Sequence, residues 1–143
     1  MRIAALALVT VWLAALSCYD IRERRLPNAL TLLGAVVILL TAGFAGRGPA
    51  ALAGAAALAG LYLLVHLVAP AGMGAGDVKL AIGLGALAGC FGVHAWFLAA
   101  LAAPLLTVAV AAAVRGGSVP HGPSMCVACA AGVGLAQRWQ WLA

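Results

Sequence analysis

The sequence predicts an all-α protein: one membrane-embedded domain over residues 1–143, built as a polytopic transmembrane bundle of about six helices. Hydrophobic residues make up 66% of the chain and charged residues only 8%. Soluble domains are about 45–50% apolar and about 25% charged, so this chain has too few charges to cover a water-facing surface. Apolar stretches recur along the whole length, which also excludes a soluble protein with one signal peptide.

Six apolar segments are candidate spans, and four of them reach the roughly 17–25 residues that a spanning helix needs. The fourth segment is short and rich in glycine, and the fifth contains Pro104, which should kink its helix. The last segment is also short and ends in Arg138-Trp139-Gln140-Trp141, which is typical of an anchor at the membrane interface. The predicted spans are Ile3–Tyr19, Ala29–Ala45, Ala50–Ala69, Val78–Phe91, His94–Val114 and Ser124–Gln137.

The first segment also resembles a lipoprotein signal, because it has a basic start, an apolar run and an Ala-Leu-Ser-Cys ending. Such signals usually have Leu three residues before the cysteine, whereas this chain has Ala15 before Cys18. We therefore expect residues 3–19 to remain as the first span.

Small residues at four-residue spacing predict where helices pack against each other. Such pairs let two helix backbones approach closely in lipid. The pairs are Ala50/Gly54, Ala56/Gly60 and Gly85/Gly89.

The distribution of Lys and Arg predicts the orientation of the bundle. The side that includes the loop 20–28 would carry Arg22, Arg24, Arg25, Lys79 and Arg115, and the other side Arg2, Arg47 and Arg138. We therefore expect the loop 20–28 to face the cytoplasm and both termini to face outside. No basic run is longer than Arg24-Arg25, so the net charge of +5 favours contact with anionic lipid and not with nucleic acid.

The three acidic residues of the chain, Asp20, Glu23 and Asp77, are candidates for function because ionisable groups beside a bilayer are costly. Two predicted spans separate Asp20 from Asp77, so both should emerge on the same face of the membrane and could meet. Two carboxyl groups in a poorly solvated site share a proton, which provides an acid and a base together. Such a pair can activate water for attack on an amide.

Two sequence motifs surround these aspartates. The first runs from Asp20 through Arg22, Arg24 and Arg25 to Pro27-Asn28, with Leu30-Thr31 after it. The second is Gly74-Ala75-Gly76-Asp77-Val78-Lys79-Leu80. Together they resemble the type IV prepilin peptidases, which are membrane aspartic proteases with a Gly-x-Gly-Asp motif.

The resemblance implies a function and a set of site residues. Asp20 and Asp77 would be the catalytic dyad, Gly74 and Gly76 would shape the turn that presents Asp77, and Pro27-Asn28 would open the second helix. The substrate would be a prepilin or pseudopilin precursor for a type IV pilus or a secretion system. Its short basic leader would be cleaved, usually just after a Gly, at the cytoplasmic face of a bacterial inner membrane.

The chain departs from the family pattern in two places. Long members carry a cytoplasmic insertion with paired Cys-x-x-Cys motifs that bind zinc, and they also N-methylate the product with S-adenosylmethionine. Only the residues 20–28 join the first two spans here, so we expect a single-domain peptidase without methylation and with no metal or other cofactor. The later motif Pro120-His121-Gly122-Pro123 has His121 where the family has an aromatic residue, which leaves the role of this loop open.

Other residues allow a structural and a functional interpretation. Lys79 could stabilise a charged aspartate, hold an acidic group of the substrate, or extend to water from the membrane interface. His66 could tune the dyad or bind backbone, and packing at a helix end is the simpler interpretation. Cys126 and Cys129 have metal-site spacing, but zinc needs about four ligands, and we expect buried thiols.

Three alternatives to the prepilin peptidase remain. Tyr19-Asp20 also resembles the Tyr-Asp motif of presenilin and signal peptide peptidase, although those proteins are much longer. The aspartates could instead form a proton or cation path in a small transporter. They could also be no more than helix caps. The sequence does not predict the oligomeric state.

Overall fold

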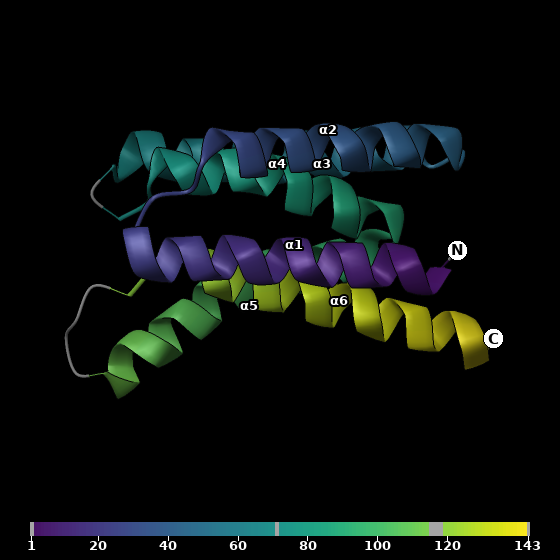
Figure 1. Ribbon diagram of the computed structural model, residues 1–143. Helices are drawn as coiled ribbons and strands as arrows, with labels where there is room; N and C mark the ends of the chain where they lie inside the picture. Colours follow the sequence, from purple (N-terminus) through teal and green to yellow (C-terminus); the bar gives the residue numbers. More distant parts are fainter. Residues whose placement is uncertain (1, 71, 115–118, 143) are drawn as a thin grey trace.

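The computed structural model describes residues 2–70, 72–114 and 119–142, with side chains described within 4–70, 72–114 and 119–138. These residues form six α-helices and no strand, so the predicted all-helical class is confirmed (Figure 1). The helices are α1 (Arg2–Glu23), α2 (Asn28–Phe44), α3 (Gly48–Val68), α4 (Ala75–Cys90), α5 (Val93–Ala113) and α6 (Gly122–Leu142).

Two helix boundaries differ from the prediction in ways that affect the aspartates. Helix α1 continues past Tyr19 to Glu23, so Asp20 lies on its last turns and not in the loop. The helix ends where Arg24 adopts φ +48°, a left-handed conformation that commonly terminates helices. Helix α4 begins at Ala75, so Asp77 lies in its first turn. Helix α5 continues without a break through Pro104.

Among the residues that the structure describes, three helices are long and apolar enough to cross a membrane by length and composition. These are α1, α3 and α5, and α2 is a shorter apolar helix. Many large apolar side chains on them point outward, including Leu8, Leu33 and Leu101. Such an outer surface is stable in lipid, where an apolar side chain loses nothing by exposure.

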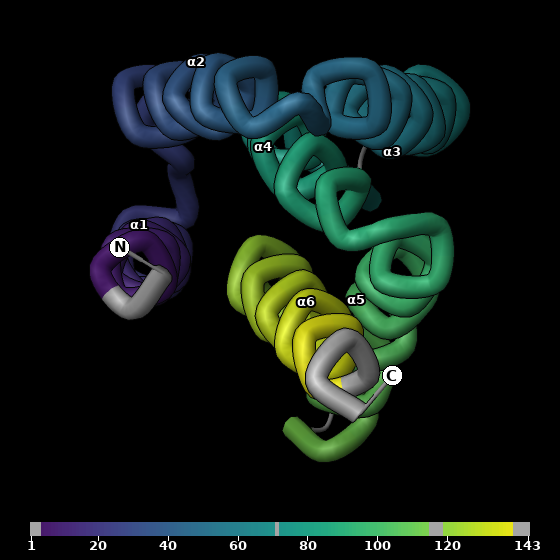
Figure 2. The backbone as a smooth tube through the Cα atoms, turned by 90° about the vertical axis from the view of Figure 1, so that its right-hand side faces the viewer, coloured from purple at the N-terminus to yellow at the C-terminus, as the bar shows by residue number. Residues whose placement is uncertain are grey.

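Helix α4 lies at the centre of the bundle. It contacts α2 and α3 on one side and α5 and α6 on the other (Figure 2). Helix α1 lies at the edge and packs against α6 and, less extensively, α2. The central position explains why α4 can be glycine-rich, since its surface meets other helices and not lipid.

The closest helix contact, between α3 and α4, uses the small residues predicted for it. A Cβ added to Gly85 would meet the carbonyl of Gly54, and one added to Gly89 would lie 2.5 Å from the carbonyl oxygen of Ala50. The prediction for Ala56 and Gly60 was wrong, because both are exposed and a Cβ at Gly60 would meet nothing within 4 Å.

Helices α1, α3 and α5 end, and helices α2, α4 and α6 begin, at one end of the bundle, whereas α1 begins and α6 ends at the other (Figure 1). This agrees with the prediction that Asp20 and Asp77 emerge on the same face. Some residues used to predict orientation and anchoring lie outside the part whose side chains are described: Arg2, Arg115, Trp139 and Trp141.

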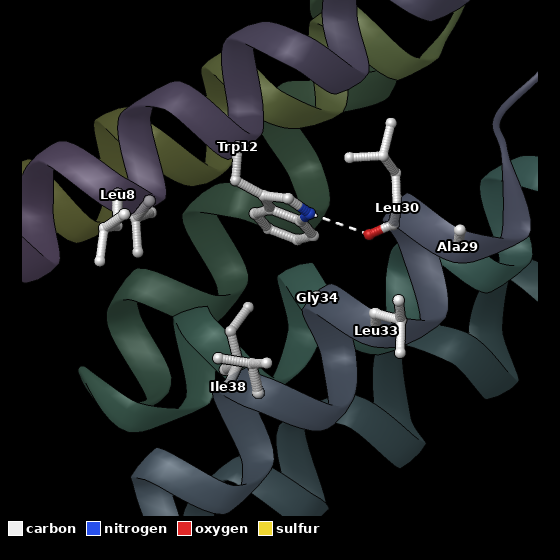
Figure 3. A pocket seen from close by; sticks show the side chains of 9 residues that line it. Leu8, Trp12, Ala29, Leu30, Leu33, Gly34 and Ile38 are labelled. Atoms are coloured by element: carbon white, nitrogen blue, oxygen red, sulfur yellow. Dashed lines mark hydrogen bonds between the residues drawn. The ribbon is translucent and has the colours of Figure 1, made fainter.

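An apolar groove of about 440 Å³ lies between α1 and α2 (Figure 3). The indole N–H of Trp12 donates a 2.9 Å hydrogen bond to the carbonyl oxygen of Leu30 across it. The indole ring lies against Gly34, where any larger residue would collide with it. The lining residues are all apolar and include neither aspartate, so the groove is a separate feature from the polar site described next.

Candidate active site

Asp20 is a buried carboxylate on α1, with only 7% of its surface exposed. The backbone N–H of Gly122, the first residue of α6, donates a 2.9 Å hydrogen bond to its Oδ2. The first N–H groups of a helix have no partner inside the helix and carry a partial positive charge. Asp20 therefore supplies from α1 the acceptor that the start of α6 needs.

This contact requires glycine at position 122. A Cβ added there would lie 2.6 Å from Oδ2 and 3.0 Å from Cγ of Asp20, which is closer than real atoms approach. Pro123, the next residue, has no N–H to offer. The sequence prediction included the motif 120–123 but did not assign Gly122 to the site. The available signal was a glycine directly before Pro123, at the point where the last helix begins.

Asp77 is half-buried in the first turn of α4. Its Oδ2 accepts a 3.2 Å hydrogen bond from the N–H of Gly74, the residue that precedes the helix. This is the reciprocal half of a capping box, so Asp77 does act as a helix cap. The cap orients the carboxylate at the helix start and does not compete with a further role.

Gly74 and Gly76 were predicted to shape the turn that presents Asp77. Neither residue has a positive φ, so the roles seen here do not depend on a left-handed backbone. Gly74 has extended backbone and donates to Asp77. At Gly76, an added Cβ would lie 3.3 Å from Cβ of Leu26, so its small size lets the α1–α2 connection approach the start of α4.

A hydrogen bond joins the two predicted motifs directly. The ammonium group of Lys79 donates to Oδ1 of Asn28 at 2.9 Å. Pro27, which precedes Asn28, has an extended conformation and its carbonyl accepts the N–H of Thr31, so it ends the connection and starts α2. Lys79 thus ties α4 to the start of α2, a contact that none of its three predicted roles included.

The two aspartates lie at the same end of the bundle, because α1 ends and α4 begins there (Figure 1). Asp20 is within the electrostatic range of Asp77. When two carboxyl groups approach each other in a partly desolvated site, ionisation of one disfavours ionisation of the other. Such a pair can hold one proton between its two members, as acid–base chemistry on an amide requires.

A cluster of three polar side chains connects α3, α5 and the residue that precedes α6. The hydroxyl of Tyr62 on α3 lies 3.2 Å from Nε2 of His121, and the hydroxyl of Thr107 on α5 lies 2.6 Å from Nδ1 of the same ring. Tyr62 also interacts electrostatically with Asp77, and His121 with Asp20. Burial lowers the pKa of His121 below its ordinary 6.5, with Asp20 acting in the opposite direction. Sequence reasoning left His121 without a role and did not identify Tyr62 or Thr107.

The remaining candidates do not join the aspartates. His66 Nδ1 donates to the carbonyl oxygen of Met73 at 2.7 Å. This is the backbone-binding alternative, and not the simple packing at a helix end that the sequence favoured. Cys126 and Cys129 are buried free thiols. Within the part of the chain that the structure describes, no three His, Cys, Asp or Glu residues are grouped as a metal site would need.

Comparison with known proteins gives a family for this site. The family model of the type IV leader peptidases matches residues 7–114. The matched segment contains both aspartates, and the loop 120–123 lies beyond it. No curated protein and no solved structure matches the chain with significance. Because the model covers most of the chain, including both aspartate motifs, this protein belongs to the type IV leader peptidase family.

Proposed function

We propose that this protein is a membrane aspartic endopeptidase that removes the leader peptide from a prepilin-like precursor, with Asp20 and Asp77 as its catalytic pair. The observation that carries the proposal is that α1 ends and α4 begins at the same end of the bundle, so that both carboxyl groups lie on one face. Each of them is also held by a backbone N–H, from Gly122 and Gly74 respectively. Family membership supports a leader peptidase, and this geometry supports the aspartic type.

The chemistry follows from two carboxyl groups that share one proton. The ionised carboxylate takes a proton from water as the water oxygen bonds to the scissile carbonyl carbon, and the other carboxyl group gives its proton to the carbonyl oxygen. The tetrahedral intermediate then collapses, the C–N bond breaks, and the leaving nitrogen takes up a proton. Because the pair titrates as a unit, we assign neither aspartate a fixed role.

The substrate would be a pilin-like precursor whose apolar helix lies in the membrane and whose leader junction is unwound near the aspartates. Asp77 is half-buried and Gly74 is exposed, so an extended peptide can approach from this side. Gly76, Lys79, Pro27 and Asn28 would support the site, because their contacts hold the first and second motifs together.

The first experiment is co-expression with a prepilin-like protein from the same source, with the substrate's mass read intact. We expect wild type to remove the leader and Asp20→Asn and Asp77→Asn to leave it. Glu23→Gln is the matched control, because Glu23 is the third acid of the chain and is exposed on the same helix as Asp20. An uncut substrate with well-folded wild type, or cleavage by either Asn variant, would contradict the proposal. An added methyl group on the product would reveal the transferase activity that we do not expect.

We further propose that the site faces the cytoplasm of a bacterial inner membrane. In a variant without the four native cysteines, Arg25→Cys reports the end that carries Asp20, and Ala45→Cys reports the α2–α3 end; both positions are exposed. We expect a membrane-impermeant thiol reagent to label Arg25→Cys in inverted vesicles and Ala45→Cys in right-side-out vesicles. The reverse pattern would refute this orientation.

A further inference from the structure

The polar cluster of Tyr62, Thr107 and His121 has a position that a packing role alone does not explain. It joins α3, α5 and the residue just before α6. The residue that follows His121 is Gly122, whose N–H bonds to Asp20. Tyr62 is only 4% exposed, and a buried hydroxyl without a partner would be costly.

The hydrogen bonds of His121 follow from the donors that are available. The hydroxyl of Thr107 has one proton, and it donates to the carbonyl oxygen of Ala103 at 3.1 Å. The Thr107 oxygen can then accept from Nδ1–H of His121, and Nε2 accepts from the hydroxyl of Tyr62. A neutral imidazole provides this combination of one donor and one acceptor.

His121 also immediately precedes α6, which begins at Gly122. Its carbonyl oxygen accepts the N–H of Met125, the first hydrogen bond of the helix. The next N–H in the chain, that of Gly122, is the donor to Asp20. The imidazole of His121 is held by α3 on one side and by α5 on the other. Its position therefore restricts where the adjacent N–H of Gly122 can lie.

We propose that His121 is a positioning residue: bound to Tyr62 and Thr107, it holds the start of α6 so that the Gly122 N–H stays on the Asp20 carboxylate. The inference rests on the proposed peptidase function and adds to it a device outside the two aspartate motifs. It also gives a role to the histidine that departs from the aromatic residue expected at this place. Misplacement of a catalytic group by about 1 Å can cost on the order of 10²-fold in rate, so the device has a measurable consequence.

The test compares pairs of variants that differ only in hydrogen bonding. His121→Leu removes the donor and the acceptor, whereas His121→Gln retains one of each. Thr107→Val removes the hydroxyl, whereas Thr107→Ser keeps it. Thr41→Val is the matched control, because the Thr41 hydroxyl bonds only carbonyl oxygens of its own helix, at Val37 and Ile38, among the hydrogen bonds of the described residues.

Steady-state cleavage of a purified prepilin-like substrate is measured in detergent, with the melting temperature of each variant. His121→Leu and Thr107→Val should lower kcat about tenfold or more while KM stays within about twofold, since the cluster acts on a catalytic carboxylate and not on substrate binding. His121→Gln and Thr107→Ser should recover most of the loss, and Thr41→Val should match wild type.

Three results would overturn the inference. Unchanged kcat in both His121→Leu and Thr107→Val would show that the cluster does not position Asp20. A rise in KM at constant kcat would assign it to substrate binding. A loss that neither Gln nor Ser recovers would mean that the site needs these side chains for packing alone. If wild type and Asp20→Asn both fail to cleave the substrate, the proposed function itself is overturned. The other three results leave the proposed function intact.

Discussion

The backbone N–H of Gly122 and the carboxylate of Asp20 form a 2.9 Å hydrogen bond between residues 102 positions apart in the chain. Both partners are buried. The bond joins the end of the first helix to the start of the last, and it makes α6 part of the site although neither aspartate lies on it. The α6 start is thus as much a part of the candidate active site as the Gly-x-Gly-Asp turn.

Gly122→Ala should therefore reduce leader removal strongly, by about 10²-fold. The new Cβ would lie 2.6 Å from Oδ2 of Asp20, so the carboxylate must move or the helix start must shift. Gly134→Ala is the matched control on the same helix, where a Cβ would meet nothing within 4 Å. Both variants are compared with wild type by the rate of substrate cleavage. Equal activity of the two variants would contradict the role of Gly122.

The contact between α3 and α4 should depend on the absence of a side chain at Gly85. Gly85→Val would push a side chain into the Gly54 backbone, and overpacking of this kind costs about 1–3 kcal/mol. The melting temperature in detergent should fall clearly. Gly60→Val, on an exposed surface with open space around it, should change it little. If the two variants melt together, the close contact is not what holds these helices.

Lys79 and Asn28 should be coupled energetically, because the ammonium group donates to the amide oxygen at 2.9 Å. We expect a coupling of about 1 kcal/mol, which is below the roughly 1.5–3 kcal/mol typical of a bond to a charged group, since both side chains are partly or fully exposed. A double-mutant cycle of Lys79→Met, Asn28→Ala and the pair, read by thermal stability, measures it. Strictly additive losses would mean that the contact contributes nothing.

The stability of the protein should depend on pH through His121. Burial lowers the pKa of this imidazole in the folded state below its ordinary 6.5, so the unfolded chain binds the proton more readily. The contribution of the neutral His121 side chain to the free energy of unfolding is therefore fully present above pH 6.5. This contribution is lost as the pH falls through the folded-state pKa of the imidazole. His121→Gln keeps hydrogen-bonding groups but cannot titrate in this range.

Melting temperatures of wild type and His121→Gln between pH 7.5 and pH 5 check this expectation. Wild type should lose more stability than the variant as the pH falls, because both share every other titrating group, including Asp20 and Asp77. Parallel curves for the two proteins would exclude His121 as the source of the dependence.

Much of the fold follows from local patterns in the sequence. The number and order of the helices depend on the lengths of apolar segments, and the shared face of Asp20 and Asp77 depends on an even number of helices between them. These properties require no knowledge of how the helices pack. The exact helix boundaries were less predictable, because helical backbone continues beyond the apolar residues. Helix α1 continues to Glu23, and helix α4 begins already at Ala75.

By itself the sequence determined the membrane class, the six helices, the two aspartate motifs and the family to which they point. Only the tertiary structure decided what lies around the aspartates: Gly122 on Asp20, Lys79 on Asn28, and His121 between Tyr62 and Thr107. The physical reason is that hydropathy and spacing act along the chain, whereas these bonds depend on which helix surfaces meet. The pairs Gly85/Gly89 and Ala56/Gly60 illustrate the difference. They have the same spacing, yet only the first faces another helix.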